Sequence, residues 1–226
     1  MERWRKIQEA YRHVGRHAVH YDRVMLHEGW LGRLCMRWLW GLDREEYPRF
    51  LEQAFRGIPK GFSGRLLEVP VGTGVISLPV YRGMPGAEVV CLDFSDAMLE
   101  AAREHARKLG LEHVSFRQGD VGALPFSDGS FDLVLSIDGF HAFPDKPGAY
   151  RETWRILREG GTFCGCMYAK GLAWRTDAFV RSFCQPMGFF TPPYETLESL
   201  EQRLSGMYRQ VRLSHVGPFA GFVCKK

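Results

Sequence analysis

From Arg65 onward the sequence alternates short apolar segments with longer segments of helical character. Five apolar segments are expected to form β-strands, at residues 65–69, 87–92, 113–117, 131–137 and 162–168. Helices are expected between them, from a glycine turn to about residue 81, from 95 to 109 and from 147 to 158. Short buried strands that alternate with helices are typical of a parallel sheet covered on both faces.

Two final strands are expected beyond the aromatic segment that follows Lys170. They occupy residues 208–215 and 219–224, and a polar helix at about 197–204 precedes them. The turn Gly217-Pro218 is short enough to make them a hairpin, which adds an antiparallel edge to the sheet. The predicted fold class is doubly wound α/β, a mostly parallel seven-stranded sheet with an antiparallel C-terminal hairpin edge and an N-terminal helical addition.

The N-terminal part is expected to be helical up to about Phe55. Four large apolar residues recur there at four-residue steps, namely Leu26, Trp30, Leu34 and Trp38. Asp43 and Glu46 resemble a capping box for a helix that ends near Gly57. A linker rich in Pro and Gly follows, so we expect a helical cap at 1–60 and a main domain at 61–226, with a substrate-side insertion at 170–206.

Composition and charge fit a globular protein of ordinary type. Lys+Arg 30 against Asp+Glu 26 gives a net charge of +4, and hydrophobic residues make up 45%. Six basic residues lie within residues 1–23, a density that favours a solvated helical face over a nucleic-acid-binding arm. The six cysteines show no CxxC spacing, which is typical of reduced, buried thiols in a cytoplasmic protein.

The most apolar stretch, residues 24–42, is interrupted by His27, Glu28, Arg33 and Arg37. We therefore expect neither a secretory signal nor an integral membrane segment. A peripheral membrane contact through residues 26–40 stays open, as does the oligomeric state.

Chemistry-bearing residues gather where the expected strands end, which is where α/β sheets bind ligands. The first strand leads into the tight turn Gly72-Thr-Gly74, which allows a ligand to approach the backbone closely. Asp93 ends the second strand, 19 positions beyond Gly74, where a carboxylate can accept hydrogen bonds from both hydroxyls of a ribose. Asp120 and Asp138 follow the third and fourth strands. The turn and Asp93 together predict a ligand that contains a nucleoside.

A dinucleotide site is less favoured than another nucleoside site. Its signature G-x-G-x-x-G/A needs a third small residue, where this chain has Ser77. The turn also lies about 70 residues into the chain.

Five stretches between about residues 65 and 168 carry a specific set of motifs. They are Leu66-Leu-Glu-Val-Pro-Val-Gly-Thr-Gly74, Val90-Cys-Leu-Asp-Phe-Ser-Asp-Ala-Met-Leu99, Gln118-Gly-Asp-Val-Gly-Ala-Leu-Pro-Phe126, Ser130-Phe-Asp-Leu-Val-Leu135 and Leu157-Arg-Glu-Gly-Gly161. In this order they resemble the class I S-adenosylmethionine-dependent methyltransferases, particularly their small-molecule, ubiquinone/menaquinone-type branch. The upstream pair Tyr21-Asp22 is similar to a Tyr-Asp that precedes the domain in that branch.

The resemblance implies a set of residues that bind S-adenosylmethionine. Its methionine end would be held by Glu68, the neighbouring Val69 and Pro70, and the turn at Gly72 and Gly74. Asp138 would lie near the methionine amino group, and Tyr21 would close over the cofactor.

The same resemblance assigns the nucleoside end. Asp93 would bind the ribose, and Phe94 and Met98 would pack on the adenine. Gly119, Asp120 and the backbone N–H of Val121 would recognise the adenine edge.

Pro70 departs from the family, which usually has Gly at this position. Proline removes one backbone N–H and keeps the carbonyl as an acceptor for an ammonium group.

The implied reaction is in-line transfer of a methyl group from a sulfonium to a nucleophile. Positioning of the reactants can supply about 7 to 11 kcal/mol of the required acceleration. His141 and, after it, Asp138 are the candidate general bases, because both follow the fourth strand at the mouth of the site. The other interpretation of His141 is a structural histidine in a loop, and no His/Cys cluster has metal-ligand spacing.

Aromatic residues outside the shared motifs indicate a small, apolar or aromatic methyl acceptor. They are Trp30, Trp38, Trp40, Trp174, Phe179, Phe183, Phe189, Phe190 and Tyr194, and the alternative for most of them is core packing. Two other functions stay open at this point. One is a nicotinamide-dependent oxidoreductase, and the other is a non-catalytic cofactor-binding protein.

Overall fold

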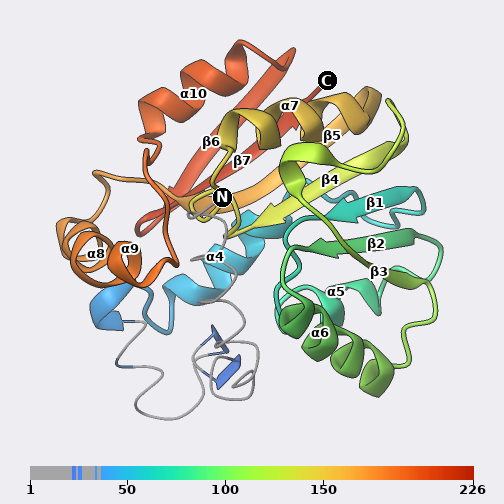
Figure 1. Ribbon diagram of the computed structural model, residues 1–226, viewed down its shortest axis with the longest axis horizontal. Helices are drawn as coiled ribbons and strands as arrows, with labels where there is room; N and C mark the ends of the chain where they lie inside the picture. The colour runs from blue at the N-terminus through green and yellow to red at the C-terminus, as the bar shows by residue number, and fades with distance from the viewer. Residues whose placement is uncertain (1–21, 24, 27–33, 35–36) are drawn as a thin grey trace.

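The computed structural model of the protein describes residues 22–23, 25–26, 34 and 37–226 (Figure 1). Tyr21, Trp30 and Cys35 lie outside the described residues. Of the expected N-terminal helical repeat, Leu34 and Trp38 are helical and Leu26 lies in a turn.

One seven-stranded sheet forms the centre of the structure (Figure 1). Its strands are β1 (Arg65–Glu68), β2 (Glu88–Asp93), β3 (Val114–Gln118), β4 (Phe131–Ile137), β5 (Leu157–Tyr168), β6 (Gln210–Val216) and β7 (Phe219–Lys225). The strand order is β3-β2-β1-β4-β5-β7-β6, and neighbours from β3 to β5 are parallel. β7 pairs antiparallel with both β5 and β6. The predicted fold class is confirmed.

Helices cover both faces of the sheet. Packed on one face are α4 (Glu46–Phe55), α5 (Leu78–Tyr81) and α6 (Asp96–Leu109), and on the other η1 (Val121–Ala123), α7 (Lys146–Ile156) and α10 (Leu197–Ser205). A continuous helical stretch follows β5, made of α8 (Trp174–Phe179), η2 (Val180–Cys184) and α9 (Gln185–Met187). No helix in the described part of the chain combines the length and apolar character needed to cross a bilayer.

Local sequence signals explain where α6 begins and ends. The Ser95 hydroxyl accepts a hydrogen bond from the Met98 amide, which satisfies one free N–H at the helix start. Gly110 closes the helix at φ 68°, a conformation that favours glycine. The observed bounds of α6 agree with the helix expected at 95–109.

Three expected local features differ in the structure. The helix expected directly after the glycine turn is only α5, because turns occupy residues 75–77. β5 begins at Leu157, since Leu157 pairs with Phe131 across a register shift in the β4–β5 ladder. Half of the capping box expected at Asp43 and Glu46 is present, because the Asp43 carboxylate accepts hydrogen bonds from the amides of Glu45 and Glu46, but α4 itself begins only at Glu46.

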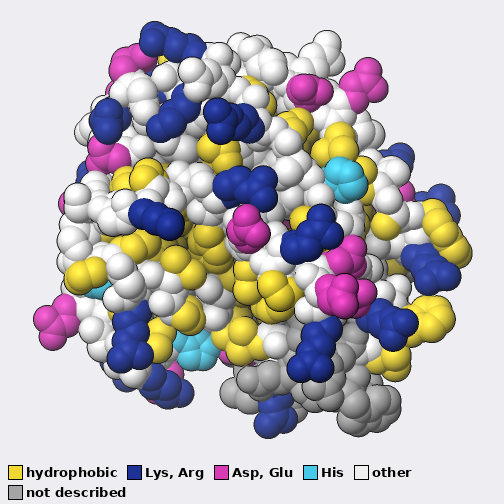
Figure 2. All heavy atoms as spheres, turned by 180° about the vertical axis from the view of Figure 1, so that it is seen from behind, with side chains coloured by type: hydrophobic (Ala, Val, Ile, Leu, Met, Phe, Trp, Pro, Cys, Tyr) yellow, Lys and Arg dark blue, Asp and Glu magenta, His cyan; other side chains and the backbone are white. Residues whose placement is uncertain are grey.

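The face shown in Figure 2 interleaves charges of both signs with hydrophobic side chains. This agrees with the small net charge of +4.

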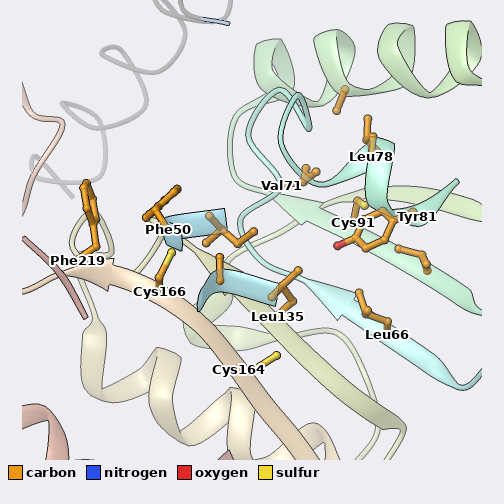
Figure 3. Close-up of a cluster of buried hydrophobic side chains, with 14 of the residues drawn as sticks. Phe50, Leu66, Val71, Leu78, Tyr81, Cys91, Leu135, Cys164, Cys166 and Phe219 are labelled. Carbon is orange, nitrogen blue, oxygen red and sulfur yellow. The ribbon is translucent and has the colours of Figure 1, made fainter. Parts of the chain in front are cut away.

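The core divides into two apolar clusters, one on each face of the sheet. Figure 3 shows part of the first cluster, in which Phe50 of α4 and Tyr81 of α5 lie over Leu66 and Leu135 of the sheet. Cys91, Cys164, Cys166, Cys184 and Cys224 are buried free thiols, as expected for the five cysteines in the described part of the chain.

Gly165 is required by the close approach of β4 and β5. Its φ is 145°, and a Cβ there would lie 1.8 Å from the carbonyl oxygen of Ser136. The clash is with backbone, so a rotamer change cannot relieve it.

We predict that Gly165→Ala lowers the free energy of unfolding by about 3 kcal/mol or more, through backbone strain and overpacking together. Gly171→Ala is the matched control, because Gly171 also has a positive φ (93°) but open space around its Cβ position. Urea unfolding of both variants measures the difference, and equal losses would contradict the steric explanation.

Candidate functional site

A cavity of about 340 Å³ lies at the carboxyl ends of the central parallel strands. Residues that follow β1, β2, β3 and β4 line one part of it, and aromatic residues from α4, α8, η2 and β7 line another. The sequence-predicted residues in its lining are Glu68, Val69, Pro70, Gly72, Gly74, Asp93, Phe94, Met98, Gly119, Asp120, Val121, Asp138 and His141. The structure therefore brings together every predicted site residue except Tyr21, which lies outside the described residues.

The glycine turn after β1 exposes its backbone to the cavity. Gly72 has φ 57°, and no atom lies within 4 Å of where its Cβ would be. Gly74 has φ 69°, and a Cβ there would lie 2.5 Å from the Leu78 side chain. Gly72 thus leaves room for a ligand, whereas Gly74 permits close packing of the turn against α5.

Asp93 joins this turn to the end of β2. One carboxylate oxygen accepts a hydrogen bond from the Gly72 amide (2.9 Å), and the other accepts one from the Ser95 amide (2.8 Å). Burial raises the pKa of Asp93 to about 6, although these amide hydrogen bonds oppose the shift. Because a carboxylate has about four acceptor positions, Asp93 can accept further hydrogen bonds from a ligand.

Glu68 lies deeper, at the end of β1. Its Oε2 accepts hydrogen bonds from the hydroxyls of Ser77 (2.8 Å) and Tyr81 (2.9 Å), and the Cys91 thiol lies 3.7 Å away. Burial raises the pKa of Glu68 to about 8. The Glu68 side chain therefore anchors Ser77 and Tyr81, which follow the glycine turn. It carries a proton at neutral pH.

Asp138 and His141 present buried polar atoms that have no protein partner. Asp138 has φ 50°, and neither its Oδ1 nor His141 Nδ1 has a hydrogen-bond partner among the described residues. Burial raises the pKa of Asp138 to about 7. Burial and, secondarily, the Lys146 ammonium lower the pKa of His141 to about 3. Buried polar atoms of this kind usually have a partner, and here they line a cavity that a ligand can enter.

Two segments complete the polar part of the cavity. Asp120 caps η1, where its Oδ1 accepts a hydrogen bond from the Gly122 amide at 2.8 Å. Pro70 packs against the loop after β4, since a Cβ on Gly139 would lie 2.2 Å from Pro70 Cδ.

Aromatic rings from distant segments form the apolar part of the cavity. Trp40 stacks on Phe190 at 5.8 Å between ring centroids, and Phe190 stacks on His141 at 3.9 Å. Phe179, Phe183 and Phe189 also line the cavity. Trp38 and Trp174 contribute neither to the cavity nor to the core, because they are 57% and 75% exposed. Tyr194 lies behind the lining, with its ring against those of Tyr168 and Phe190.

Sequence reasoning missed several lining residues: Met25, Tyr47, Phe50, Thr73 and Phe219. Tyr47 and Phe50 lie three residues apart on α4, so their spacing predicts that they share one face of the helix. It does not predict what that face contacts. Phe219 begins β7, and no local signal places it near α4.

Thr73 connects the glycine turn to the N-terminal segment. Its hydroxyl donates to Asp22 Oδ1 at 2.6 Å, and its carbonyl oxygen lies 2.9 Å from His105 Nδ1. His105 Nε2 is also 3.5 Å from Asp22 Oδ2. Asp22, the residue after Tyr21, therefore contacts both the glycine turn and α6.

Comparison with known proteins identifies relatives. Residues 63–185 match the family model described as a methyltransferase domain. The demethylmenaquinone methyltransferase of Thermus thermophilus is 41% identical over 121 residues, which cover 54% of this chain and 53% of that protein. The ubiquinone/menaquinone biosynthesis C-methyltransferase of Dinoroseobacter shibae is 35% identical over 129 residues, covering 55% of this chain and 52% of that protein. The chain spans about half the length of these curated relatives.

The fold also matches solved structures. A SAM-dependent methyltransferase from Thermotoga maritima aligns over 97% of this chain and 99% of its own, with a TM-score of 0.67 and 18% identity. At this level of identity the match concerns the fold alone.

We predict that Glu68→Gln removes part of the pH dependence of stability. Between pH about 4.5 and 8 the unfolded chain has released the Glu68 proton and the folded chain has kept it, so wild-type stability falls as pH rises in this window. The slope from one such group is at most about 1.4 kcal/mol per pH unit. The stability of Glu68→Gln relative to wild type should therefore increase from pH 5 to pH 8.

Urea unfolding at several pH values measures this change. Glu201→Gln on the exposed side of α10 is the matched control, because it makes the same substitution outside the buried site. A Glu68→Gln curve parallel to that of wild type would refute a proton held by Glu68.

Proposed function

The chain belongs to the methyltransferase domain family, and from this premise we propose that it is an S-adenosylmethionine-dependent methyltransferase acting on a small, apolar or aromatic acceptor. One observation carries the proposal. A single cavity joins the carboxylates and the glycine turn at the strand ends to an aromatic wall. The first part suits a charged nucleoside, and the second suits a flat or apolar molecule.

The residues in the polar part fit S-adenosylmethionine. Asp93 has free acceptor positions for the ribose hydroxyls, and the space above Gly72 leaves room for the ligand. The unpartnered Asp138 Oδ1 is an acceptor for the methionine ammonium group.

The nucleoside base would lie beyond the ribose, among residues that follow β2 and β3. Phe94 and Met98 would contact the adenine, and Asp120 with the Val121 amide would recognise its edge. Glu68 would act indirectly, because its Oε2 already accepts hydrogen bonds from Ser77 and Tyr81. Tyr21 remains a predicted contact.

S-adenosylmethionine supplies an activated methyl group, so the protein contributes mainly by positioning. The aromatic side chains would exclude water and hold the acceptor beside the polar half of the cavity. In this proposal residues 1–60 and 170–206 shape the acceptor side, and residues 61–226 form the cofactor-binding domain. Its five buried free thiols favour a reducing compartment such as the cytoplasm.

The two predicted general bases, Asp138 and His141, would act only weakly as bases once the cofactor is bound. A base works best when its pKa lies near the working pH, and the pKa of Asp138, which burial raises to about 7, would be lowered again by pairing with the ammonium group. His141, whose pKa is lowered to about 3, is neutral but weakly basic. We therefore propose that His141 orients the acceptor through its unpartnered Nδ1.

The first prediction concerns the ribose. Asp93→Ala should weaken binding of S-adenosylhomocysteine by about 2 to 4 kcal/mol, because two hydrogen bonds to a charged acceptor are lost. Isothermal titration calorimetry measures the affinity, with NAD titrated in parallel and expected to give no binding heat. Asp96→Ala is the matched control, since Asp96 is an exposed carboxylate three residues away. An unchanged affinity of Asp93→Ala for S-adenosylhomocysteine would show that the ribose does not bind at Asp93.

The second prediction concerns Asp138. An ammonium group pairs with its carboxylate form, so the affinity for S-adenosylhomocysteine should rise as pH increases from 5 to 7. Asp138→Asn should remove that part of the rise, whereas His141→Gln should keep it, because His141 is neutral throughout this range. Identical pH profiles for wild type and Asp138→Asn would contradict the assignment.

A further inference from the structure

Large apolar side chains and arginines are exposed along the helical stretch after β5, and the exposed Trp38 lies beside Arg175 of that stretch. We define the Trp–Arg patch as Trp38, Trp174, Arg175, Arg181, Phe183 and Met187. The exposed fractions are 75% for Trp174, 57% for Trp38, 51% for Met187 and 49% for Phe183. α8 lies at the left of Figure 1, and the corresponding right edge of Figure 2 shows hydrophobic and cationic side chains next to one another.

The patch is built from two segments that are fastened together. The Arg175 guanidinium lies over both indole rings, 5.3 Å from the ring centroid of Trp38 and 5.4 Å from that of Trp174. Behind them, the Thr176 hydroxyl donates to the Leu39 carbonyl oxygen at 2.8 Å. These contacts hold the two rings on the surface.

The charge of residues 170–188 is positive. Between Lys170 and Gly188 the basic residues are Lys170, Arg175 and Arg181, all of them exposed, and the one acidic residue is Asp177. The half-buried Asp177 carboxylate accepts hydrogen bonds from the Tyr168 hydroxyl (2.6 Å) and the Gly171 amide (3.0 Å). The Asp177 carboxylate is thus engaged by protein donors. The exposed cationic side chains of this segment attract anions.

The patch also borders the cavity. Phe183 is half exposed and at the same time lines the cavity. Its ring stacks on Phe179 at 5.3 Å, and Phe179 meets Trp40 at 5.7 Å. A continuous series of ring contacts therefore runs from the surface to the aromatic wall.

We propose that the Trp–Arg patch docks onto the surface of a lipid bilayer that contains anionic headgroups. Tryptophan rings favour the headgroup level of a bilayer, and arginines near its surface are attracted to anionic lipids. Protein interfaces are also enriched in tryptophan, methionine and arginine. We choose the bilayer because the positive charge of residues 170–188 complements anionic headgroups, and because the ring contacts lead from this surface to the apolar wall of the cavity. Docking in this orientation places Phe183 against the bilayer. The use of that route by an apolar methyl acceptor rests on the proposed function, but the docking itself does not.

Co-sedimentation of the full chain with lipid vesicles tests the proposal. Vesicles of phosphatidylcholine with about one third phosphatidylglycerol should bind the protein at low salt, and binding should fall at high salt. Pure phosphatidylcholine vesicles should bind it much less. Arg175→Glu/Arg181→Glu should lower the partition coefficient about tenfold or more, and Trp38→Ala/Trp174→Ala should lower it as well.

Arg151→Glu/Arg212→Glu is the matched control, since it changes the net charge equally at exposed positions of α7 and β6. Equal losses in both arginine pairs would overturn the proposal in favour of nonspecific charge attraction. Absence of vesicle binding, or a dimer in solution that Trp38→Ala/Trp174→Ala abolishes, would also overturn it. S-adenosylhomocysteine titration of the patch variants separates this proposal from the proposed function, because their affinity should equal that of wild type.

Discussion

The two amide hydrogen bonds accepted by Asp93 fix the relative position of three elements. Through the Gly72 amide the carboxylate holds the turn after β1, and through the Ser95 amide it holds the start of α6. This carboxylate constrains the glycine turn from one side, while the backbone at Gly72 stays open to a ligand. The cavity depends on this arrangement, since its polar part consists of the turn and the strand ends on either side of it.

Three buried carboxyl groups at strand ends share an electrostatic character. Burial raises the pKa values of Glu68, Asp93 and Asp138 to about 8, 6 and 7. Each charged form is therefore destabilised in the folded chain, and each group is sensitive to an opposite charge brought by a ligand. Their partners differ, because Glu68 and Asp93 have protein donors whereas Asp138 Oδ1 has none among the described residues. The first two organise the loop, and the third is left for a ligand.

The sequence predicts the parallel sheet and the polar half of the cavity well, because both depend on local patterns. The number and approximate bounds of the strands follow from alternation, and Gly72, Asp93 and Asp138 each lie at or shortly after the end of a strand. The aromatic half is predicted less well. Trp174 and Phe183 lie in the same helical stretch, yet one is on the surface and the other lines the cavity. Phe219 reaches the cavity only because β7 inserts between β5 and β6, a long-range pairing without a local signal.

Gln53 links the helix α4 to the last hairpin. Its side-chain amide donates to the Phe219 carbonyl oxygen at 3.1 Å, and its oxygen accepts from the Ser214 hydroxyl at 2.9 Å. The apolar wall is thus assembled from three segments far apart in the sequence, residues 40–50, 179–190 and 219, while the polar part comes from residues 68–141. Mutations can therefore accumulate in the wall without disturbing the polar part. In the proposed methyltransferase the acceptor side of the cavity can thus change in sequence separately from the side that would bind the cofactor.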